Sequence, residues 1–478
     1  MADETRRKVY LLEPRRLSPE TIAVTFAKTS RSPLSFREIA EELSDEQSAA
    51  FHEKWVVGYG HASVAEHAVL HIAFENVSRL AIESIESNRL ASYTEKSTRY
   101  QRWDPDDYYV PDEVRGEAFE GIYRETCDAL FQAYLASLEP VRSVVQRANP
   151  RREGESDEKW DGRLRSRYVD ACRFLLPAAA LANVGMTANA RVLEHAIGKM
   201  LAHPLDEVRR VGEETKAATK AEVPTLLKYA DPLDYVRRAE AQLSERLRGS
   251  PPQGAPPEAG DPVRLVRRMP DTDEAVLAAA LYSAAGESLG SLLARVSAMS
   301  PGDKSALAAD LLAGRGAHDA PVRALEHTVF TFDVVLDQGA YFELKRHRMM
   351  TQTPQSLTTR LGYAVPRLMV EAGFLPDYEA AMKKAAEAFE ALAGWNHHVA
   401  AYLVPNGYRR RVALTMNLRE AFHFCELRSA ANAHFSIRRI ALRMAEILRA
   451  EAPLLAEYLR LPGDVTWKQI EDEHFERA

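Results

Sequence analysis

The sequence predicts an α+β protein made of two homologous domains in tandem, each a small sheet with several helices. A length of 478 residues exceeds one ordinary core, so two domains are expected. The stretch RLRGSPPQGAPPEAGDP, dense in Pro and Gly, predicts an exposed linker at 246–262. The third observation is a set of landmarks that occurs twice. We therefore expect one domain at 1–245 and a second at 263–478.

The repeated landmarks follow the same order in both halves of the chain. Each half has a Glu-His pair, an apolar run, an Arg, and a Ser eight residues beyond that Arg. A proline fourteen residues before another Arg follows, and then an Arg-Arg pair. This order indicates a gene-fused pair of homologous domains. The matched residues are Glu66-His67 and Glu326-His327, Arg89 and Arg348, Ser97 and Ser356, Pro177 and Pro405, Arg191 and Arg419, and Arg209-Arg210 and Arg438-Arg439.

Periodicity places strands and helices within each half. The segments 68–77 and 328–336 are short and rich in β-branched and aromatic residues, which predicts a half-buried strand in each domain. The segments 273–299 and 433–460 carry apolar residues at three- and four-residue intervals, which predicts amphipathic helices. Each domain should therefore place several helices against a small sheet.

Polar stretches separate these elements. The residues that follow Arg89 and Arg348 are mostly Ser, Thr, Gln and Tyr, and we expect ordered loops there. The polar insertion at 150–167 is expected to be a loop or a helix cap region.

Composition and charge exclude several classes of protein. With 46% apolar residues, 27% charged residues and a net charge of -7, the chain is expected to be soluble and globular and to bind neither nucleic acid nor membrane. No run approaches the length of a membrane span, and MADETRRKVY lacks the apolar segment of a signal peptide, so a cytoplasmic location is expected. The unpaired spacing of Cys127, Cys172 and Cys425 predicts no disulfide framework.

The stretch KRHRMMTQTPQSLTTRLGY carries the strongest chemical signal. Arg346, His347 and Arg348 place three donors side by side, and guanidinium groups suit phosphate or carboxylate oxygens. A basic run by itself is typical of a solvated surface. The hydroxyl and amide side chains that follow favour a polar, anionic ligand instead. The stretch NRLASYTEKSTRYQR of the first half has a similar composition and adds Glu95.

The simpler structural interpretations apply to the other polar landmarks. Histidines 61, 67 and 327 are by default packed residues with one hydrogen bond each. The arginines at 191, 209, 419 and 438 are by default salt-bridged surface residues, and only their recurrence in both halves favours function. No second carboxylate or cysteine falls at a ligand spacing, so no metal site is predicted.

Both halves resemble the flavin-dependent thymidylate synthases, whose signature is R-H-R-x-x-S-x-N-E-x-S-x-R-Y. In the first half, SNRLASYTEKSTRY keeps the later part of the signature, but Ser87 and Asn88 replace the leading Arg-His. The second half keeps the leading Arg-His-Arg and departs later. There Thr351 replaces the first Ser, Thr353 the Asn and Pro354 the Glu, while Thr358 stands where the signature has Arg and Arg360 follows two residues on.

The resemblance implies FAD-dependent methylation of dUMP to dTMP, with methylenetetrahydrofolate and NADPH as co-substrates. It implies catalytic roles for Arg438, Ser97 and Ser356. It implies flavin contacts from Arg346, His347, Arg348, His61, Arg89, Asn432 and Arg428. It implies nucleotide contacts from Glu95, Ser97, Arg99, Arg191, Arg209, Ser356, Arg360, Arg419 and Arg438.

Because family members are homotetramers, the resemblance also implies a homodimer of this chain that forms a pseudo-tetramer. In it the Arg346–Arg348 motif of one copy would hold FAD beside a nucleotide held by Glu95, Ser97 and Arg99 of the other. Two alternatives stay open. One is a related flavoenzyme that acts on another pyrimidine nucleotide, and the other is a flavin- or nucleotide-binding protein without turnover.

Overall fold

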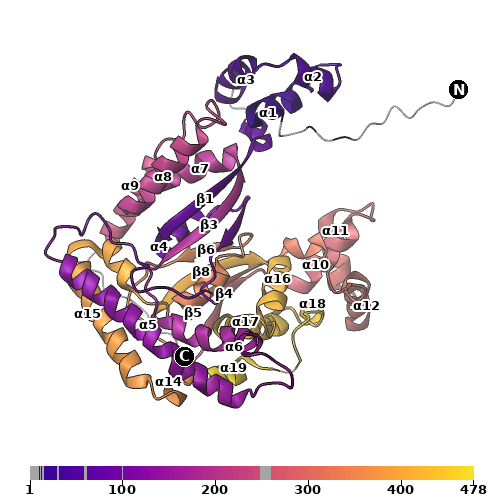
Figure 1. Cartoon of the computed structure of the whole chain (residues 1–478). Helices are drawn as coiled ribbons and strands as arrows, with labels where there is room; N and C mark the ends of the chain where they lie inside the picture. The colour runs from indigo at the N-terminus through magenta and orange to yellow at the C-terminus, as the bar shows by residue number, and fades with distance from the viewer. Residues whose placement is uncertain are drawn as a thin grey trace. The chain divides into compact units, whose positions relative to one another are not determined.

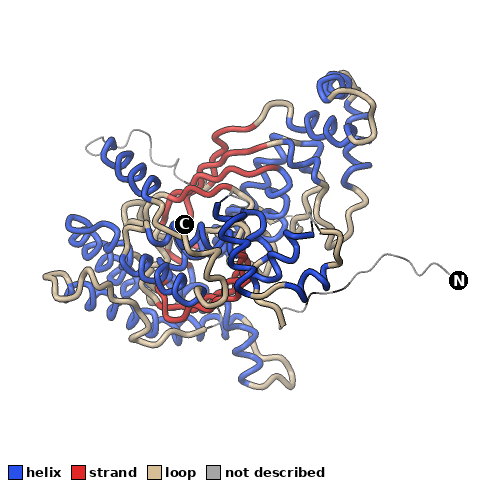
Figure 2. The backbone as a smooth tube through the Cα atoms, turned by 90° about the horizontal axis from the view of Figure 1, so that it is seen from above, coloured by secondary structure: helices blue, strands red, loops and turns tan. Residues whose placement is uncertain are grey.

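In the computed structural model of the protein, two compact units make up the chain (Figures 1 and 2). Unit 1 comprises Met1–Lys96, Pro111–Arg115 and Leu181–Pro251, and unit 2 comprises Ser97–Val110, Gly116–Ala180 and Pro252–Ala478. The first half of the sequence therefore contributes two segments to unit 2. The structure describes residues 10, 12, 16–29, 32–58, 62–99, 101–247, 260–463 and 465–478. Most of the expected linker at 246–262 lies outside these residues.

Unit 1 is an antiparallel three-stranded sheet in the order β1-β3-β2, with helices against one face. The strands are β1 (Val69–Ser78), β2 (Ala91–Glu95) and β3 (Leu181–Asn189). Helix α4 contacts β1 and β3, and α7 packs on α8. The helices are α1 (Pro19–Lys28), α2 (Phe36–Glu42), α3 (Asp45–Phe51), η2 (His52–Gly58), η3 (Ala62–His67), α4 (Arg79–Ile85), α7 (Ala190–Leu201), α8 (Asp206–Thr219) and α9 (Asp234–Leu247).

Unit 2 contains a four-stranded sheet in the order β4-β5-β8-β6, and Phe330, Phe332 and Leu414 belong to its buried core. Its strands are β4 (Val263–Arg268), β5 (Val329–Asp337), β6 (Thr351–Pro354) and β8 (Arg409–Asn417), with β7 (Val365–Pro366) paired to β9 (Phe475–Arg477). Its helices from the first sequence half are α5 (Glu120–Ala148), α6 (Asp157–Cys172) and η4 (Arg173–Leu175). Those from the second half are α10 (Thr272–Tyr282), α11 (Leu289–Ser297), α12 (Pro301–Leu312), η5 (Arg323–His327), α13 (Gln338–Leu344), α14 (Arg367–Glu371), α15 (Leu375–Ala400), η6 (Ala401–Leu403), α16 (Leu418–Arg428), α17 (Phe435–Glu451), α18 (Pro453–Ala456) and α19 (Trp467–His474).

The strand pairing shows that the two sheets are copies of one design. Strand β1 begins with Val69 opposite Asn189, and β5 begins with Val329 opposite Asn417. Strands β2 and β6 join their sheets at the same place, with Ser92 opposite Thr187 and Thr351 opposite Thr415. In the same way Glu95 lies opposite Val184, and Pro354 lies opposite Val412. The register thus reproduces the alignment in which Thr351 replaces Ser92 and Pro354 replaces Glu95.

The expectation of loops after Arg89 and Arg348 was wrong, because both stretches contain a strand, β2 and β6. Both are edge strands that alternate between a more buried and a more exposed side chain. Polar residues fit the exposed side of an edge strand, so polarity alone does not indicate a loop. The insertion at 150–167 becomes helical from Asp157, where the Ser156 hydroxyl accepts from the backbone of Lys159.

One buried capping contact occurs in both copies with its two partners exchanged. In unit 1, Ser78 caps α4, and its hydroxyl donates to Glu207 of α8 over 2.6 Å. In unit 2, Asp337 caps α13 and accepts from the hydroxyl of Ser436 on α17. The carboxylate and the hydroxyl have changed places, while the hydrogen bond is kept. Each copy therefore retains the interaction and not the residues.

Within unit 2, equivalent segments of the two sequence halves contact each other. Pro177 and Pro405 form an antiparallel β-bridge, and α5 packs against α15. The amide of Ala179 donates to the carbonyl of Tyr402, and the amide of Gly407 donates to Phe174. Contact between matching segments is the pattern of an isologous interface between two subunits.

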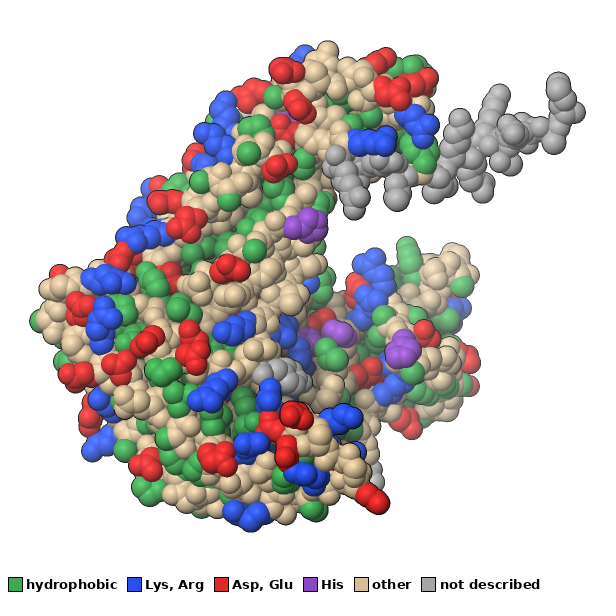
Figure 3. Space-filling model, viewed as in Figure 1, with side chains coloured by type: hydrophobic (Ala, Val, Ile, Leu, Met, Phe, Trp, Pro, Cys, Tyr) green, Lys and Arg blue, Asp and Glu red, His purple; other side chains and the backbone are tan. Residues whose placement is uncertain are grey.

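Among the described residues, no helix is both long enough and apolar enough to cross a membrane. On the face shown in Figure 3, basic and acidic side chains are intermingled over the region of α5 and α15.

Candidate functional site

Three arginines and two carboxylates meet inside unit 2, and we call this group the arginine cluster. Its members come from five places along the chain. Arg99 follows β2, Asp170 lies in the last turn of α6, Arg173 begins η4, Glu343 lies on α13 and Arg428 ends α16. The first sequence half thus supplies three members and the second half supplies two.

Ion pairs connect the members of the arginine cluster. Arg99 makes a bidentate contact with Asp170, at 2.8 and 2.7 Å, and its Nη1 donates to the carbonyl of Asn432 at 2.9 Å. Arg428 donates from Nη1 to Glu343 at 3.1 Å. Arg173 lies between the carboxylates, 4.0 Å from Asp170 and 3.9 Å from Glu343. Bidentate guanidinium contacts of this kind fix the orientation of both groups.

Burial governs the electrostatics of the arginine cluster. Arg173 is only 2% exposed, and burial lowers the pKa of its guanidinium. Burial likewise raises the pKa of the Asp170 carboxyl and lowers the pKa of Arg428. Each charge is therefore costly alone and is offset by its neighbours.

His347, in the middle of the Arg-His-Arg motif, is buried beside this cluster. Its Nε2 accepts from Arg428 Nε at 2.9 Å, and its Nδ1 lies 3.2 Å from a carboxylate oxygen of Glu420. Since Nε2 accepts, Nδ1 carries the proton and donates to Glu420. Arg346 is exposed and Arg348 half-buried. The motif therefore has an anchored centre and two cationic neighbours nearer the surface.

His434 is fully buried near Asp170. Its burial makes the stability of the fold depend on pH. Its Nδ1 accepts from the Ser436 amide, so Nε2 donates to the Asp170 carbonyl. Burial, with Arg173 and Arg99 nearby, holds the pKa of His434 well below its usual value. The unfolded chain therefore takes up a proton below about pH 6.5 that the folded chain excludes, and stability falls by up to about 1.4 kcal/mol per pH unit.

Replacing His434 by glutamine should make the free energy of unfolding less dependent on pH between about 6.5 and 5. Urea titrations at several pH values measure this slope. His327→Gln, at an exposed position, is the matched control. Equal slopes for the His434 variant and the wild-type protein would contradict the prediction.

Several residues expected at the site have other partners in the structure. Glu95 forms a buried ion pair with Arg79 of unit 1 at 2.7 Å. At the equivalent positions of the second copy, Gln338 accepts from Arg410, and Pro354 replaces the carboxylate. The Arg79–Glu95 pair has thus been replaced as a unit, which gives Pro354 a structural explanation.

Most of the remaining expected residues take no part in the ion pairs of the arginine cluster, and one of them lies outside the described residues. Arg360 pairs with Glu390 on the surface, and Arg438 donates to the carbonyl of Ser429. Arg209 donates to the carbonyls of His203 and Pro204. Arg89 and Ser356 are exposed, Ser97 is half-buried, and His61 lies outside the described residues.

The Glu-His landmark of each copy is bound to the later arginine of the same copy. Arg191 pairs with Glu66 at 2.5 Å in unit 1, and Arg419 pairs with Glu326 at 3.0 Å in unit 2. The repeated spacing in the sequence therefore corresponds to a repeated ion pair. Both pairs are partly exposed, as the default interpretation of these arginines expects.

Asp170, Arg173 and Glu343 were not predicted from the sequence. Arg173 stands four residues before Pro177, and Ala401 stands four before Pro405, so the residue is present in one copy only. A search for landmarks shared by both copies passes over it. The whole arginine cluster is likewise present in one copy only. The positions equivalent to Arg99, Asp170, Arg173, Glu343 and Arg428 are Thr358, His398, Ala401, Ser84 and Met200.

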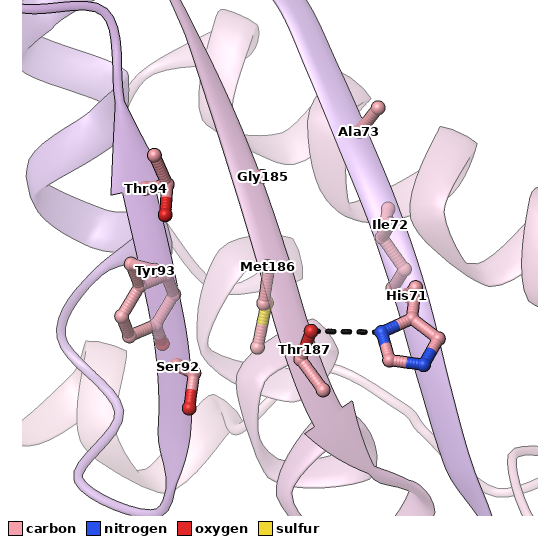
Figure 4. Close-up of a pocket in the computed structure, with 9 residues that line it drawn as sticks. All are labelled: His71, Ile72, Ala73, Ser92, Tyr93, Thr94, Gly185, Met186 and Thr187. Atoms are coloured by element: carbon pink, nitrogen blue, oxygen red, sulfur yellow. Dashed lines mark hydrogen bonds between the residues drawn. The ribbon is translucent and has the colours of Figure 1, made fainter.

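Two surface hollows lie elsewhere. One, of about 340 Å³, lies on the open face of the unit 1 sheet, where His71 and Thr187 share a hydrogen bond of 2.9 Å (Figure 4). The other, of about 660 Å³, lies between α10, α12 and η5 beside Glu326 and His327. Within the described ranges, no group of three or more His, Cys, Asp or Glu side chains is placed to hold a metal ion.

Comparison with known proteins defines the class. The Thy1 family model, described as thymidylate synthase complementing protein, matches residues 14–225 and again 264–454. The chain is therefore an α+β protein with two copies of one family domain. It belongs to the thymidylate synthase complementing protein family.

Some relatives match this chain over most of their own length. A UPF0159 protein of Chlamydia pneumoniae is 32% identical over 465 residues, covering 88% of this chain and 86% of that protein. A UPF0159 protein of Chlamydia muridarum is 30% identical and covers 92% of this chain and 90% of that protein. A flavin-dependent thymidylate synthase of Clostridium tetani is 28% identical over 230 residues, covering 47% of this chain and 87% of the enzyme.

One solved structure that matches part of this chain is the UMP/dUMP methylase PolB from Streptomyces cacaoi bound with 5-Br dUMP. It is 21% identical with a TM-score of 0.33, and the match covers 41% of this chain and 93% of that one.

Proposed function

We propose that this protein is an FAD-dependent thymidylate synthase that methylates dUMP to dTMP, with methylenetetrahydrofolate as carbon donor and NADPH as hydride source. The observation that carries the proposal is the arginine cluster, assembled from both copies beside His347 of the Arg-His-Arg motif. Family membership and the flavin-dependent relatives support it. The five equivalent positions with the two copies exchanged hold none of the cluster's residues. We therefore propose one competent site per chain.

The residues present suit a flavin and a nucleotide. Arg346 and Arg348 lie nearer the surface than His347 and offer guanidinium donors for phosphate oxygens. His347 and Arg428 are held to each other and to carboxylates, so their geometry is set before a ligand arrives. A flavin held there would supply, once reduced by NADPH, the hydride that the methylation consumes. The guanidinium of Arg428 polarises a ring carbonyl, as a preorganised donor does.

We also propose that two chains form a homodimer with four domain copies. The contact between Pro177 and Pro405 joins matching segments of the two copies inside one chain. In a protein with a single copy, the same contact would require two subunits, so one tandem chain stands for two subunits. Sedimentation should therefore give a species of twice the chain mass. The nucleotide and the folate are the partners in this scheme.

A second candidate is a related flavoenzyme acting on another pyrimidine nucleotide. The observation that favours it concerns the signature carboxylate, since Glu95 is paired with Arg79 and the second copy has Pro354 instead. Rescue of a thymidine auxotroph and formation of dTMP from dUMP by the purified flavoprotein separate the two candidates. A purified flavoprotein that neither rescues the auxotroph nor forms dTMP, and that turns over no other pyrimidine nucleotide, would favour the binding protein without turnover.

Flavin content gives a direct test of the site. The purified protein should hold about one FAD per chain. Arg346→Ala and His347→Ala should each weaken FAD binding at least about tenfold, because they remove a cationic donor and the buried side chain that anchors the Arg-His-Arg motif. Ser87→Ala and Asn88→Ala, at the equivalent positions of the first copy, are matched controls and should bind FAD normally. Two FAD per chain, or equal losses in both sets, would count against a single composite site.

A further inference from the structure

Glu343 lies within the arginine cluster with part of its hydrogen-bonding capacity unused. The residue is 7% exposed, and Oε2 accepts from Arg428 Nη1 at 3.1 Å. Among the described residues, Oε1 accepts no hydrogen bond. The neighbouring cation is Arg173, whose Nη2 lies 3.9 Å from Oε1. A buried carboxylate oxygen without a donor is costly, so its retention calls for an explanation.

Guanidinium donors stand on both sides of this carboxylate. Within the described residues, the hydrogen bonds of Arg428 use Nε and Nη1, which leaves Nη2 as a donor. Arg173 uses Nη1 for Thr98 at 2.9 Å, while its Nη2 is 3.5 Å from the carbonyl of Gly339. That second contact is at the limit of a hydrogen bond. The three side chains therefore present a donor, an acceptor and a donor.

We infer that Glu343 determines which pyrimidine the site accepts, by taking the N3–H of a uracil ring while Arg173 and Arg428 donate to the two flanking carbonyl oxygens. Uracil presents an acceptor, a donor and an acceptor along this edge, which matches the three side chains. Cytosine presents two acceptors and then an amino group, so its N3 meets the carboxylate without a proton. This inference rests on the proposed function, in which the arginine cluster binds a pyrimidine nucleotide.

The charge of Glu343 itself also favours a neutral base edge over a phosphate at this carboxylate. Glu343 neutralises part of the charge of Arg173 and Arg428, and Asp170 is bound in the same way to Arg99. A phosphate here would bring its negative charge against two buried carboxylates. A neutral imide edge brings no such charge and satisfies the unused oxygen of Glu343.

The experiment measures binding of three nucleotides to the full-length protein with FAD bound. Calorimetric titration should show that dUMP binds at least about tenfold more tightly than both dCMP and 3-methyl-dUMP. The methyl group of 3-methyl-dUMP removes the N3–H and leaves both carbonyl oxygens, so this comparison tests whether the site contacts N3 closely, and the Glu343 variant assigns that contact to a residue. Equal affinities for dUMP and 3-methyl-dUMP would overturn the inference and leave the proposed function standing.

A pair of variants tests the residue itself. In Glu343→Gln the amide offers an acceptor to uracil or a donor to the N3 of cytosine, so the preference for dUMP over dCMP should fall to about threefold or less. Ser84→Gln, at the equivalent position of the first copy, should keep the wild-type preference. An unchanged preference in Glu343→Gln overturns the inference. Failure of the wild-type protein to bind any of the three nucleotides overturns the proposed function and the inference with it.

Discussion

Arg173→Ala is expected to lower the free energy of unfolding of unit 2 by about 4 kcal/mol. Arg173 is fully buried, donates to Thr98 at 2.9 Å, and lies within 4.0 Å of both Asp170 and Glu343. Its removal leaves two buried carboxylates with one arginine each and opens a polar void. Four of the five tryptophans, at 103, 160, 395 and 467, lie in unit 2, so fluorescence during urea titration follows this transition.

The matched control for Arg173 is Arg124→Ala. Arg124 pairs with Glu120 over 2.8 Å on the surface of α5, with both side chains partly exposed. Exposed pairs of this spacing contribute about 0.5 kcal/mol, so this variant should be nearly neutral. If Arg173→Ala cost no more than Arg124→Ala, the arginine cluster would not be a structural centre of unit 2.

The second large effect concerns the exchanged capping contact in unit 1. Ser78→Asp should cost about 3 kcal/mol, because the new carboxylate lies buried against Glu207. Glu207→Ser alone should also destabilise, because it leaves the Ser78 amide and hydroxyl without their acceptor. The double variant recreates the chemistry of Asp337 and Ser436 in the second copy. It should recover about 2 kcal/mol of the summed losses.

Circular dichroism during urea titration of the wild type, both single variants and the double variant completes this cycle. A favourable coupling energy shows that the carboxylate and the hydroxyl are interchangeable as a pair. Strict additivity of the two losses would refute the interpretation that the copies exchanged the ends of one hydrogen bond.

Much of the fold was predictable from local patterns. The strands expected at 68–77 and 328–336 are β1 and β5, and the helices expected at 273–299 and 433–460 begin with α10 and α17. The duplication was predictable because matched residues recur at similar spacing. Strand pairing then confirmed the alignment at single positions, including Pro354 against Glu95.

The errors have a common physical origin. Strands β2 and β6 were expected to be loops because their side chains are polar, yet an edge strand exposes one side to water and takes its hydrogen bonds from a neighbour distant in sequence. The contact of Glu95 with a nucleotide stays a prediction, but the ion pair of Glu95 was not predictable from the sequence. Its partner, Arg79, lies sixteen residues earlier on α4, and no spacing rule connects the two.

The sequence by itself determined the family, the α+β class, the duplication and the position at which each copy departs from the shared signature. These properties depend on residue types and on spacing along the chain. Only the tertiary structure decided that Arg99 and Arg173 of the first half join Glu343 and Arg428 of the second. The reason is that buried charges are tolerated only where opposite charges surround them, and such neighbours are brought together by packing and not by sequence order.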